Sequence, residues 1–314
     1  MSVTMQEIEA RVKRSHAQEA AEIPAILRIH RLSISFHAPV VRAVDEVSLE
    51  VKEGRIVALV GESGSGKSTL AQAVPGLLDP RRHTAEGEIW LDGTDLRRLS
   101  ARELRRYRGS TVAMIFQDPA NALNPVLTIG TQLTETIRRH RKVQGAEAKK
   151  LAVGQLRRAG LPKPETLLRK FPFQLSGGMC QRVMIAIALA SGAKLLIADE
   201  PTTALDVTVQ AQILQELDQL RRETGMGILL ITHDLGVVAE IADEVYVMKG
   251  GRIVESGHVF EIFAHPRHAY TRELLESRQT GGAWKGGQDR CETDRDGRTD
   301  EGISTGGAMV SVRK

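Results

Sequence analysis

Short runs of apolar residues divide the chain and predict buried strands. Residues 56–60 (IVALV), 195–198 (LLIA) and 228–231 (ILLI) contain only apolar side chains. Runs of four or five such residues are typical of strands that are covered on both faces, as in a parallel sheet. Between residues 179 and 277 these strands alternate with helix-like stretches. The pattern therefore predicts a parallel sheet covered by helices.

Two earlier regions have different patterns. Residues 25–117 are rich in strand-like segments, among them 32–35 and GEIWLDG at 87–93. Residues 118–178 are helix-rich: Leu133, Ile137 and Leu151 mark apolar positions, and LPKPE at 161–165 interrupts the run. We expect these regions to share one core rather than to form independent domains.

A glycine-rich loop, GESGSGKST at residues 61–69, directly follows the apolar run 56–60. Gly61, Gly66, Lys67 and Ser68 match the spacing of the phosphate-binding P-loop. Glycines let the loop aim successive backbone N–H groups at phosphate oxygens, and the helix that follows adds its positive N-terminal end. Lys67 would reach the β- and γ-phosphates, and the Ser68 hydroxyl would hold Mg²⁺. An ordinary glycine turn is the alternative, which the preceding strand and the small residues that follow disfavour.

Adjacent carboxylates, Asp199 and Glu200, end the apolar run 195–198. Acidic residues at the carboxyl end of a parallel strand face the ligand crevice of an open sheet. Asp199 is suited to Mg²⁺, directly or through water, and Glu200 is then placed to polarise an attacking water. Alone, such a pair is often a solvated strand end; after a P-loop, the metal interpretation is favoured.

With the additional motif LSGGM at residues 175–179, the chain resembles the ATP-binding subunit of an ABC transporter over residues 25–277. The resemblance implies an α/β P-loop NTPase cassette: a mostly parallel core sheet, an antiparallel β subdomain and a helical subdomain at about 118–178. Residues 1–24 would be an N-terminal extension and 278–314 a tail. It also implies that two such subunits face each other, with ATP binding closing the pair and hydrolysis reopening it.

The resemblance assigns further roles by position. Phe36 would stack on adenine, or else be a phenylalanine of a strand core. Gln117, in MIFQDP, would contact Mg²⁺ and the γ-phosphate and link them to the membrane subunit. His233 would hold the γ-phosphate and the attacking water with Glu200, although a lone histidine at a strand end is usually a structural or surface residue. The remaining nucleotide contacts would be Ser63, Gly64, Thr69, the partner-facing Ser176, Gly177 and Gly178, and Asp206 in TALD.

Longer segments resemble the oligopeptide, dipeptide and nickel importer branch. They are DPANALNPVLTIG (118–130), PTTALDVTVQAQIL (201–214), ITHDLGVVAEIADEV (231–245) and HPRHAYTRELLES (265–277). The resemblance implies import across the bacterial inner membrane, with peptide as the first expectation for the cargo and nickel as the alternative. Residues 121–130 would shape the surface where a coupling helix docks, or would be only a proline-containing loop.

Three departures from that branch stand out. Cys180 replaces the usual basic residue after LSGGM, and Phe171 and Phe173 replace a tyrosine and a histidine. Cys180 is either a buried inert residue or a reactive thiol at a helix N-terminal turn. The Gly-, Asp- and Arg-rich stretch 278–314 lacks apolar periodicity and is expected to be disordered.

Composition changes this picture little. The net charge of +4 and the arginine-rich stretches 97–108 and 138–142 invite a nucleic-acid interpretation. Interleaved glutamates favour a solvated face instead, with attraction to anionic lipid as a lesser alternative. No apolar run approaches the ~20 residues that span a bilayer, and the N-terminus lacks the apolar segment of a secretory signal. Two cysteines suit a reducing cytosol.

Three function classes remain. An importer ATPase would use ATP and Mg²⁺ at the cytoplasmic face of the membrane. Its partners would be two transmembrane permease subunits, a second ATP-binding subunit that is identical or related, and, indirectly, a solute-binding protein. A soluble ABC-type ATPase should show a long coiled-coil insertion, zinc cysteines or a duplicated cassette. A non-catalytic module could lose Glu200 or His233, and both are present.

Overall fold

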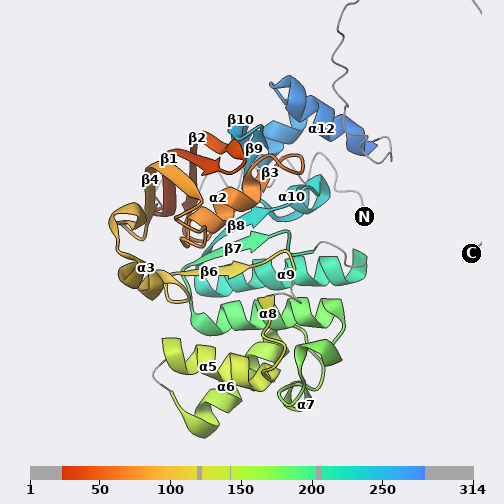
Figure 1. The fold of residues 1–314 in the computed structure, drawn as a ribbon. Coiled ribbons are helices and arrows are strands. Elements are labelled where there is room, and N and C mark those ends of the chain that lie inside the picture. Colours follow the sequence, from red (N-terminus) through yellow and green to blue (C-terminus); the bar gives the residue numbers. More distant parts are fainter. Residues whose placement is uncertain (1–22, 119–121, 142, 203–206, 280–314) are drawn as a thin grey trace, which may run out of the picture.

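The computed structural model describes residues 23–118, 122–141, 143–202 and 207–279. Asp206, most of the N-terminal extension and nearly all of the expected tail therefore lie outside the described residues. The described part contains two sheets stacked with helices in layers (Figure 1). The prediction of an α/β fold with a mostly parallel core sheet is confirmed.

The core sheet contains every apolar run that predicted a buried strand. Its strands, in spatial order, are β10 (Arg252–His258), β9 (Glu244–Lys249), β3 (Ile56–Val60), β8 (Gly227–Ile231), β7 (Leu195–Asp199) and β6 (Val112–Ile115). All neighbours pair in parallel except β10, which is antiparallel to β9. Every residue of β3, β7 and β8 is buried, as the uninterrupted apolar runs require.

The second sheet is the expected antiparallel subdomain. It has the order β2 (Val40–Lys52), β1 (Ala25–His37), β4 (His83–Leu91) and β5 (Thr94–Asp95). The strand-like segment 32–35 lies within β1, and 87–93 contains the end of β4. The inner face of this sheet packs against the core sheet through Leu32, Ile34 and Val44.

Alternate residues of the core strands face two different apolar cores. Val57 and Leu59 belong to the core shared with the antiparallel sheet and with α2 (Lys67–Ala73). Ile56, Ala58 and Val60 belong to a core shared with α8 (Gly177–Ser191). The period of two that defines a strand thus places α2 and α8 on opposite faces of the core sheet (Figure 1).

The helices outside this layer form the region expected from residues 118–178. They are α5 (Ile129–His140), α6 (Gly145–Arg158), α7 (Pro164–Leu167) and the 3₁₀ turn η2 (Pro172–Gln174). Leu133 and Ile137 are fully buried, and Leu151 is half-buried against the same core. Pro164 begins α7, since a proline at the first helical position loses no hydrogen bond.

The remaining elements connect or flank these layers. They are η1 (Leu96–Arg98), α3 (Ala101–Tyr107), α9 (Val207–Thr224), α10 (Leu235–Ile241), α11 (Val259–Ala264) and α12 (Ala269–Gln279). Among the described residues, no helix combines the length and the apolar character needed to cross a bilayer.

Candidate nucleotide site

The P-loop links β3 to α2, and its glycines are required by close packing. Gly66 caps α2 with a φ of 103°, a left-handed conformation that favours glycine. A Cβ atom on Gly66 would lie 2.1 Å from the carbonyl oxygen of Ala43, and one on Gly61 would lie 2.0 Å from that of Met248. The loop therefore lies directly against the backbones of β2 and β9.

The Lys67 ammonium lies inside this loop. Its Nζ donates to the carbonyl oxygens of Gly61 at 2.8 Å and Glu62 at 2.6 Å, and to Ser65 Oγ at 3.3 Å. Burial lowers the pKa of Lys67, while the charges of Glu200, Asp199 and Glu62 act in the opposite direction. The ammonium is thus held within the ring of backbone groups that would receive phosphate.

Ser68 and Asp199 meet beside the loop. Ser68 Oγ donates to Asp199 Oδ1 at 3.2 Å, and Asp199 is 3% exposed. Burial raises the pKa of Asp199; the Ser68 hydrogen bond and the Lys67 charge oppose this, whereas Glu200 adds to it. A hydroxyl and a carboxylate are oxygen ligands of the kind that Mg²⁺ takes, so these side chains fit that ion.

The described residues hold no group of three or more His, Cys, Asp and Glu side chains that could bind a metal by themselves. Mg²⁺ usually keeps several waters and is held by one or two protein oxygens together with substrate phosphates. Ser68 and Asp199 therefore fit the part of such a site that a protein supplies.

Glu200 joins two residues that are far from it in sequence. Its Oε2 accepts a hydrogen bond from Gln117 Nε2 at 2.9 Å, and its Oε1 lies 3.2 Å from His233 Nδ1. Gln117, Glu200 and His233 follow β6, β7 and β8, which are adjacent in the core sheet. Because parallel strands end at the same edge, this topology brings the three side chains together.

The backbone at Glu200 is strained. Its φ is +48°, in the left-handed region that a non-glycine residue seldom adopts, and its N–H donates to the carbonyl oxygen of Ile231 at 2.8 Å. Such strain persists where the surrounding structure imposes it, and it is concentrated at functional sites.

The signature residues lie apart from the P-loop. Ser176 is the N-cap of α8, where its hydroxyl accepts a hydrogen bond from Met179 N at 3.4 Å. A Cβ atom on Gly177 would meet nothing within 4 Å, so this turn of the helix is open to another molecule. The signature and the P-loop begin two different helices, α8 and α2, whose bodies pack on opposite faces of the core sheet (Figure 1).

The remaining sequence predictions have mixed outcomes. Phe36 is half-buried in β1, with its ring centroid 6.1 Å from that of His83, so the structure leaves part of the ring available for stacking. Cys180 is buried, as the first alternative expected, and burial raises the pKa of its thiol, which favours the inert alternative over the reactive one. The rings of Phe171 and Phe173 stack on each other, with their centroids 5.5 Å apart.

Two contacts of the site were not foreseen. Tyr270 Oη accepts a hydrogen bond from the backbone N–H of Glu62 in the P-loop at 2.8 Å. Gln181 Nε2 donates to the carbonyl oxygen of Pro201, next to Glu200, at 2.7 Å. Tyr270 belongs to the segment 265–277, which indicated the branch but carried no assigned role. Gln181 follows the signature by only two positions.

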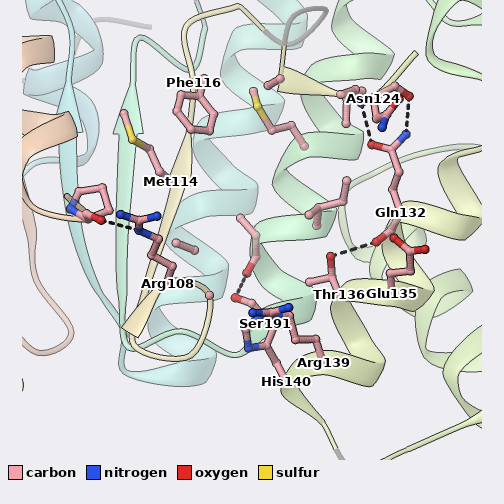
Figure 2. Close-up of a pocket in the computed structure, with 18 of the residues that line it drawn as sticks. Arg108, Met114, Phe116, Asn124, Gln132, Glu135, Thr136, Arg139, His140 and Ser191 are labelled. Atoms are coloured by element: carbon pink, nitrogen blue, oxygen red, sulfur yellow. Dashed lines mark hydrogen bonds between the residues drawn. The ribbon is translucent and has the colours of Figure 1, made fainter. Parts of the chain in front are cut away.

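A separate groove of about 820 Å³ lies between β6 and helices α5 and α8 (Figure 2). Its apolar lining includes Phe116, Leu123 and Met184, while Arg139 and His140 lie next to each other at one end (Figure 2). Gln132 closes another side: its amide group donates to Asn124 O at 3.0 Å and accepts from Asn124 N at 3.0 Å. Phe116 precedes Gln117 directly, so the groove and the Glu200 cluster share one short segment.

Comparison with known proteins identifies the family. Residues 44–203 match the family model described as ABC transporter. The oligopeptide transport ATP-binding protein OppD of Bacillus subtilis (strain 168) is 49% identical over 261 residues, which are 82% of this chain and 73% of that protein. The dipeptide transport ATP-binding protein DppD of Escherichia coli (strain K12) is 49% identical over 257 residues, which are 81% of this chain and 78% of that protein.

Other relatives are longer or more distant. The chain spans about half, 47%, of the peptidoglycan transport ATP-binding protein YejF of Agrobacterium fabrum (strain C58 / ATCC 33970), at 49% identity over 82% of this chain. The dimeric post-hydrolysis structure of the ATP-binding cassette MJ0796, bound to ADP and Pi, has a TM-score of 0.67 and 30% identity, covering 74% of this chain and 98% of that one. These findings confirm the family and the fold inferred from the motifs. The chain belongs to the ABC transporter family as an ATP-binding ATPase subunit, in the branch of the oligopeptide and dipeptide transport ATP-binding proteins.

Proposed function

We propose that this chain hydrolyses ATP with Mg²⁺ in a two-subunit arrangement and thereby drives the import of peptides through a membrane permease. The observation that carries the chemical part is the cluster in which Glu200 contacts both Gln117 and His233. Lys67, Ser68 and Asp199 lie in the neighbouring P-loop cluster. The cargo rests on the relatives, which are named for oligopeptide and dipeptide transport.

Each residue of these clusters has a proposed task. Lys67 binds the β- and γ-phosphates; Ser63, Gly64, Gly66 and Thr69 form the cradle around them, and Phe36 stacks on adenine. Ser68, Asp199 and Gln117 hold Mg²⁺, which when bound neutralises charge on the phosphate oxygens. Glu200 accepts a proton from the attacking water, and His233 orients that water and the γ-phosphate. Little covalent help is needed, because phosphoryl transfer depends mainly on positioning and on charge stabilisation.

The second half of the site comes from another subunit. Ser176, Gly177 and Gly178 form the start of α8, where a Cβ atom on Gly177 would meet nothing within 4 Å. We propose that they cap the γ-phosphate bound by the partner, and that Asp206, outside the described residues, joins the two sites. The similar cassette MJ0796 is described as dimeric, which supports this arrangement.

The groove of Figure 2 is the proposed docking surface for the permease. An apolar lining with a polar rim suits a short amphipathic segment of a partner. Phe116 lines the groove, and the next residue, Gln117, contacts Glu200, so movement of a docked segment reaches the nucleotide cluster through one peptide unit.

The assembly that follows has two permease subunits, a second ATP-binding subunit and, indirectly, a solute-binding protein. The chain would be peripheral at the cytoplasmic face of the inner membrane, and its surface arginines would be solvated rather than bound to nucleic acid. Within the chain we propose one domain at residues 25–277, with a helical subdomain at about 118–178. The segments 1–24 and 278–314 would flank it.

The test is affinity purification of the tagged chain from detergent-solubilised membranes, with mass spectrometry of stoichiometric partners. Recovery of two multispanning proteins and a second ATPase supports the importer, and peptide-stimulated ATP hydrolysis of that complex with its binding protein supports the cargo. Stimulation by nickel alone would overturn the peptide assignment. Recovery of the soluble chain alone, or with ribosomes or DNA, would overturn the transport assignment.

A further inference from the structure

Helix α12, near the end of the described chain, holds the P-loop by one buried side chain. Tyr270 is 4% exposed, and its Oη accepts a hydrogen bond from Glu62 N at 2.8 Å across 208 positions of sequence. No step of the proposed hydrolysis uses this tyrosine. Its contact is with the residue that follows Gly61, at the start of the phosphate cradle.

Glu62 is restrained at both of its backbone polar groups. Its N–H donates to Tyr270 Oη, and its carbonyl oxygen accepts from Lys67 Nζ at 2.6 Å. The second restraint depends on a group that is needed elsewhere, because phosphate competes with the loop carbonyls for the Lys67 ammonium. When Lys67 turns toward phosphate, the Glu62 carbonyl keeps the hydrogen bond from Ser65 N at 3.3 Å, and the Tyr270 hydroxyl is the side-chain group that still restrains the Glu62 N–H.

Tyr270 itself is held firmly. Lys249 Nζ lies 4.4 Å from the centroid of the tyrosine ring, a cation–π contact. The start of α12 is fixed to β10, because the Glu255 carboxylate accepts the backbone N–H groups of Arg267 at 2.7 Å and His268 at 3.0 Å. The phenol is therefore presented to the loop from a rigid support.

We propose that Tyr270 is a positioning residue for ATP, which keeps Glu62 and the start of the P-loop in the phosphate-binding geometry while Lys67 binds phosphate. The inference rests on the proposed ATP site. A cradle that is already ordered loses less conformational freedom when the ligand binds, so the effect falls on nucleotide affinity. Turnover of bound ATP depends on Glu200 and His233 and is left largely unchanged.

The test compares Tyr270→Phe with Tyr246→Phe in the full chain. Tyr246 is the control, since its Oη likewise accepts a backbone N–H, that of Glu50 at 3.3 Å, and it is half-buried where Tyr270 is buried. Each variant removes one hydroxyl that accepts one backbone hydrogen bond and keeps the ring. The thermal midpoint should therefore fall by a similar small amount in both.

We expect Tyr270→Phe to raise the Kd and the KM for ATP about fivefold, in line with one net hydrogen bond, with kcat within about twofold. Tyr246→Phe should leave all three unchanged. Hydrogen exchange measured without nucleotide should show faster exchange of the segment 61–66 in Tyr270→Phe only, which a general loss of stability would not produce.

The possible outcomes separate a failure of the proposed function from a failure of the Tyr270 inference. If the wild-type chain binds no ATP, the proposed function and this inference both fail. If the wild type binds ATP and Tyr270→Phe matches it in Kd, KM and exchange, only the inference fails. An equal shift in Tyr246→Phe would also overturn it, because the effect would then be a general consequence of losing a tyrosine hydroxyl.

Discussion

Glu200 Oε1 lies 3.2 Å from Nδ1 of His233, at the carboxyl ends of two adjacent parallel strands. The carboxylate is largely enclosed, with a side-chain exposure of 16%, whereas the imidazole is 62% exposed. The acid is thus held at the sheet edge, while the histidine side chain is largely exposed. This asymmetry suits a glutamate base that is already in position before ATP binds, and a histidine that can move when two subunits close.

Glu200→Gln should stop turnover and preserve binding. The amide keeps the shape and its oxygen can still accept the hydrogen bond from Gln117, but it cannot act as a base, and general-base catalysis contributes about 10²–10⁴-fold. We expect kcat to fall at least 100-fold, ATP affinity to change less than threefold and an ATP-bound dimer to accumulate in size-exclusion chromatography. Glu240→Gln, an exposed glutamate on α10, is the control. Unchanged hydrolysis in Glu200→Gln would contradict the role of Glu200.

Asp199→Asn should stabilise the nucleotide-free fold and abolish Mg²⁺-dependent hydrolysis. Burial raises the pKa of Asp199, so its charged form is disfavoured in the fold, and an amide of the same shape avoids this cost. We expect a higher thermal midpoint at neutral pH. A carboxyl group whose pKa is higher in the folded state than in the unfolded state lowers the free energy of unfolding at pH values above its folded-state pKa. This effect disappears at pH values below its unfolded-state pKa.

The stability difference between Asp199→Asn and the wild type should therefore shrink as the pH is lowered through the pKa of Asp199. Chemical unfolding at several pH values in the absence of Mg²⁺ measures it. A difference that grows on acidification would contradict the stated cause.

Val126→Asp should uncouple the chain from its permease. Val126 is 77% exposed and lies in sequence between Asn124 and Leu127, which line the groove, so the substitution leaves the core intact. A charge on an apolar docking surface should reduce recovery of membrane partners at least tenfold, while ATP hydrolysis by the isolated chain stays within twofold. Gln215→Asp on α9 adds the same charge at another exposed position. Equal loss of partners in both variants would argue against this groove.

Removal of residues 279–314 should leave the nucleotide site working. The described contacts of the site run from Phe36 to Tyr270, so the shortened chain retains all of them. We expect ATP affinity and permease assembly within twofold of the full chain, measured by nucleotide titration and co-purification. A chain that ends at Pro266 instead loses α12 with Tyr270 and should bind ATP more weakly. Loss of ATP binding in the chain that lacks only residues 279–314 would show that the tail has a function of its own.

The sequence by itself determined the features that depend on neighbouring residues. The apolar runs 56–60, 195–198 and 228–231 are strands because uninterrupted apolar segments of that length bury both faces. The P-loop could be predicted because its spacing and glycines act through the local backbone. Glu200 became a candidate from its place at a buried strand end, Gln117 and His233 became candidates from motif resemblance, and the roles of all three stay predictions.

Tertiary structure decided how these parts meet. Gln117, Glu200 and His233 converge because β6, β7 and β8 are neighbours in the sheet, an order that no single segment encodes. Likewise, Tyr270 reaches Glu62 only because α12 packs beside β9 and the P-loop. Local propensity specifies strands and turns, whereas contacts between distant segments depend on how the apolar faces of all elements are buried together.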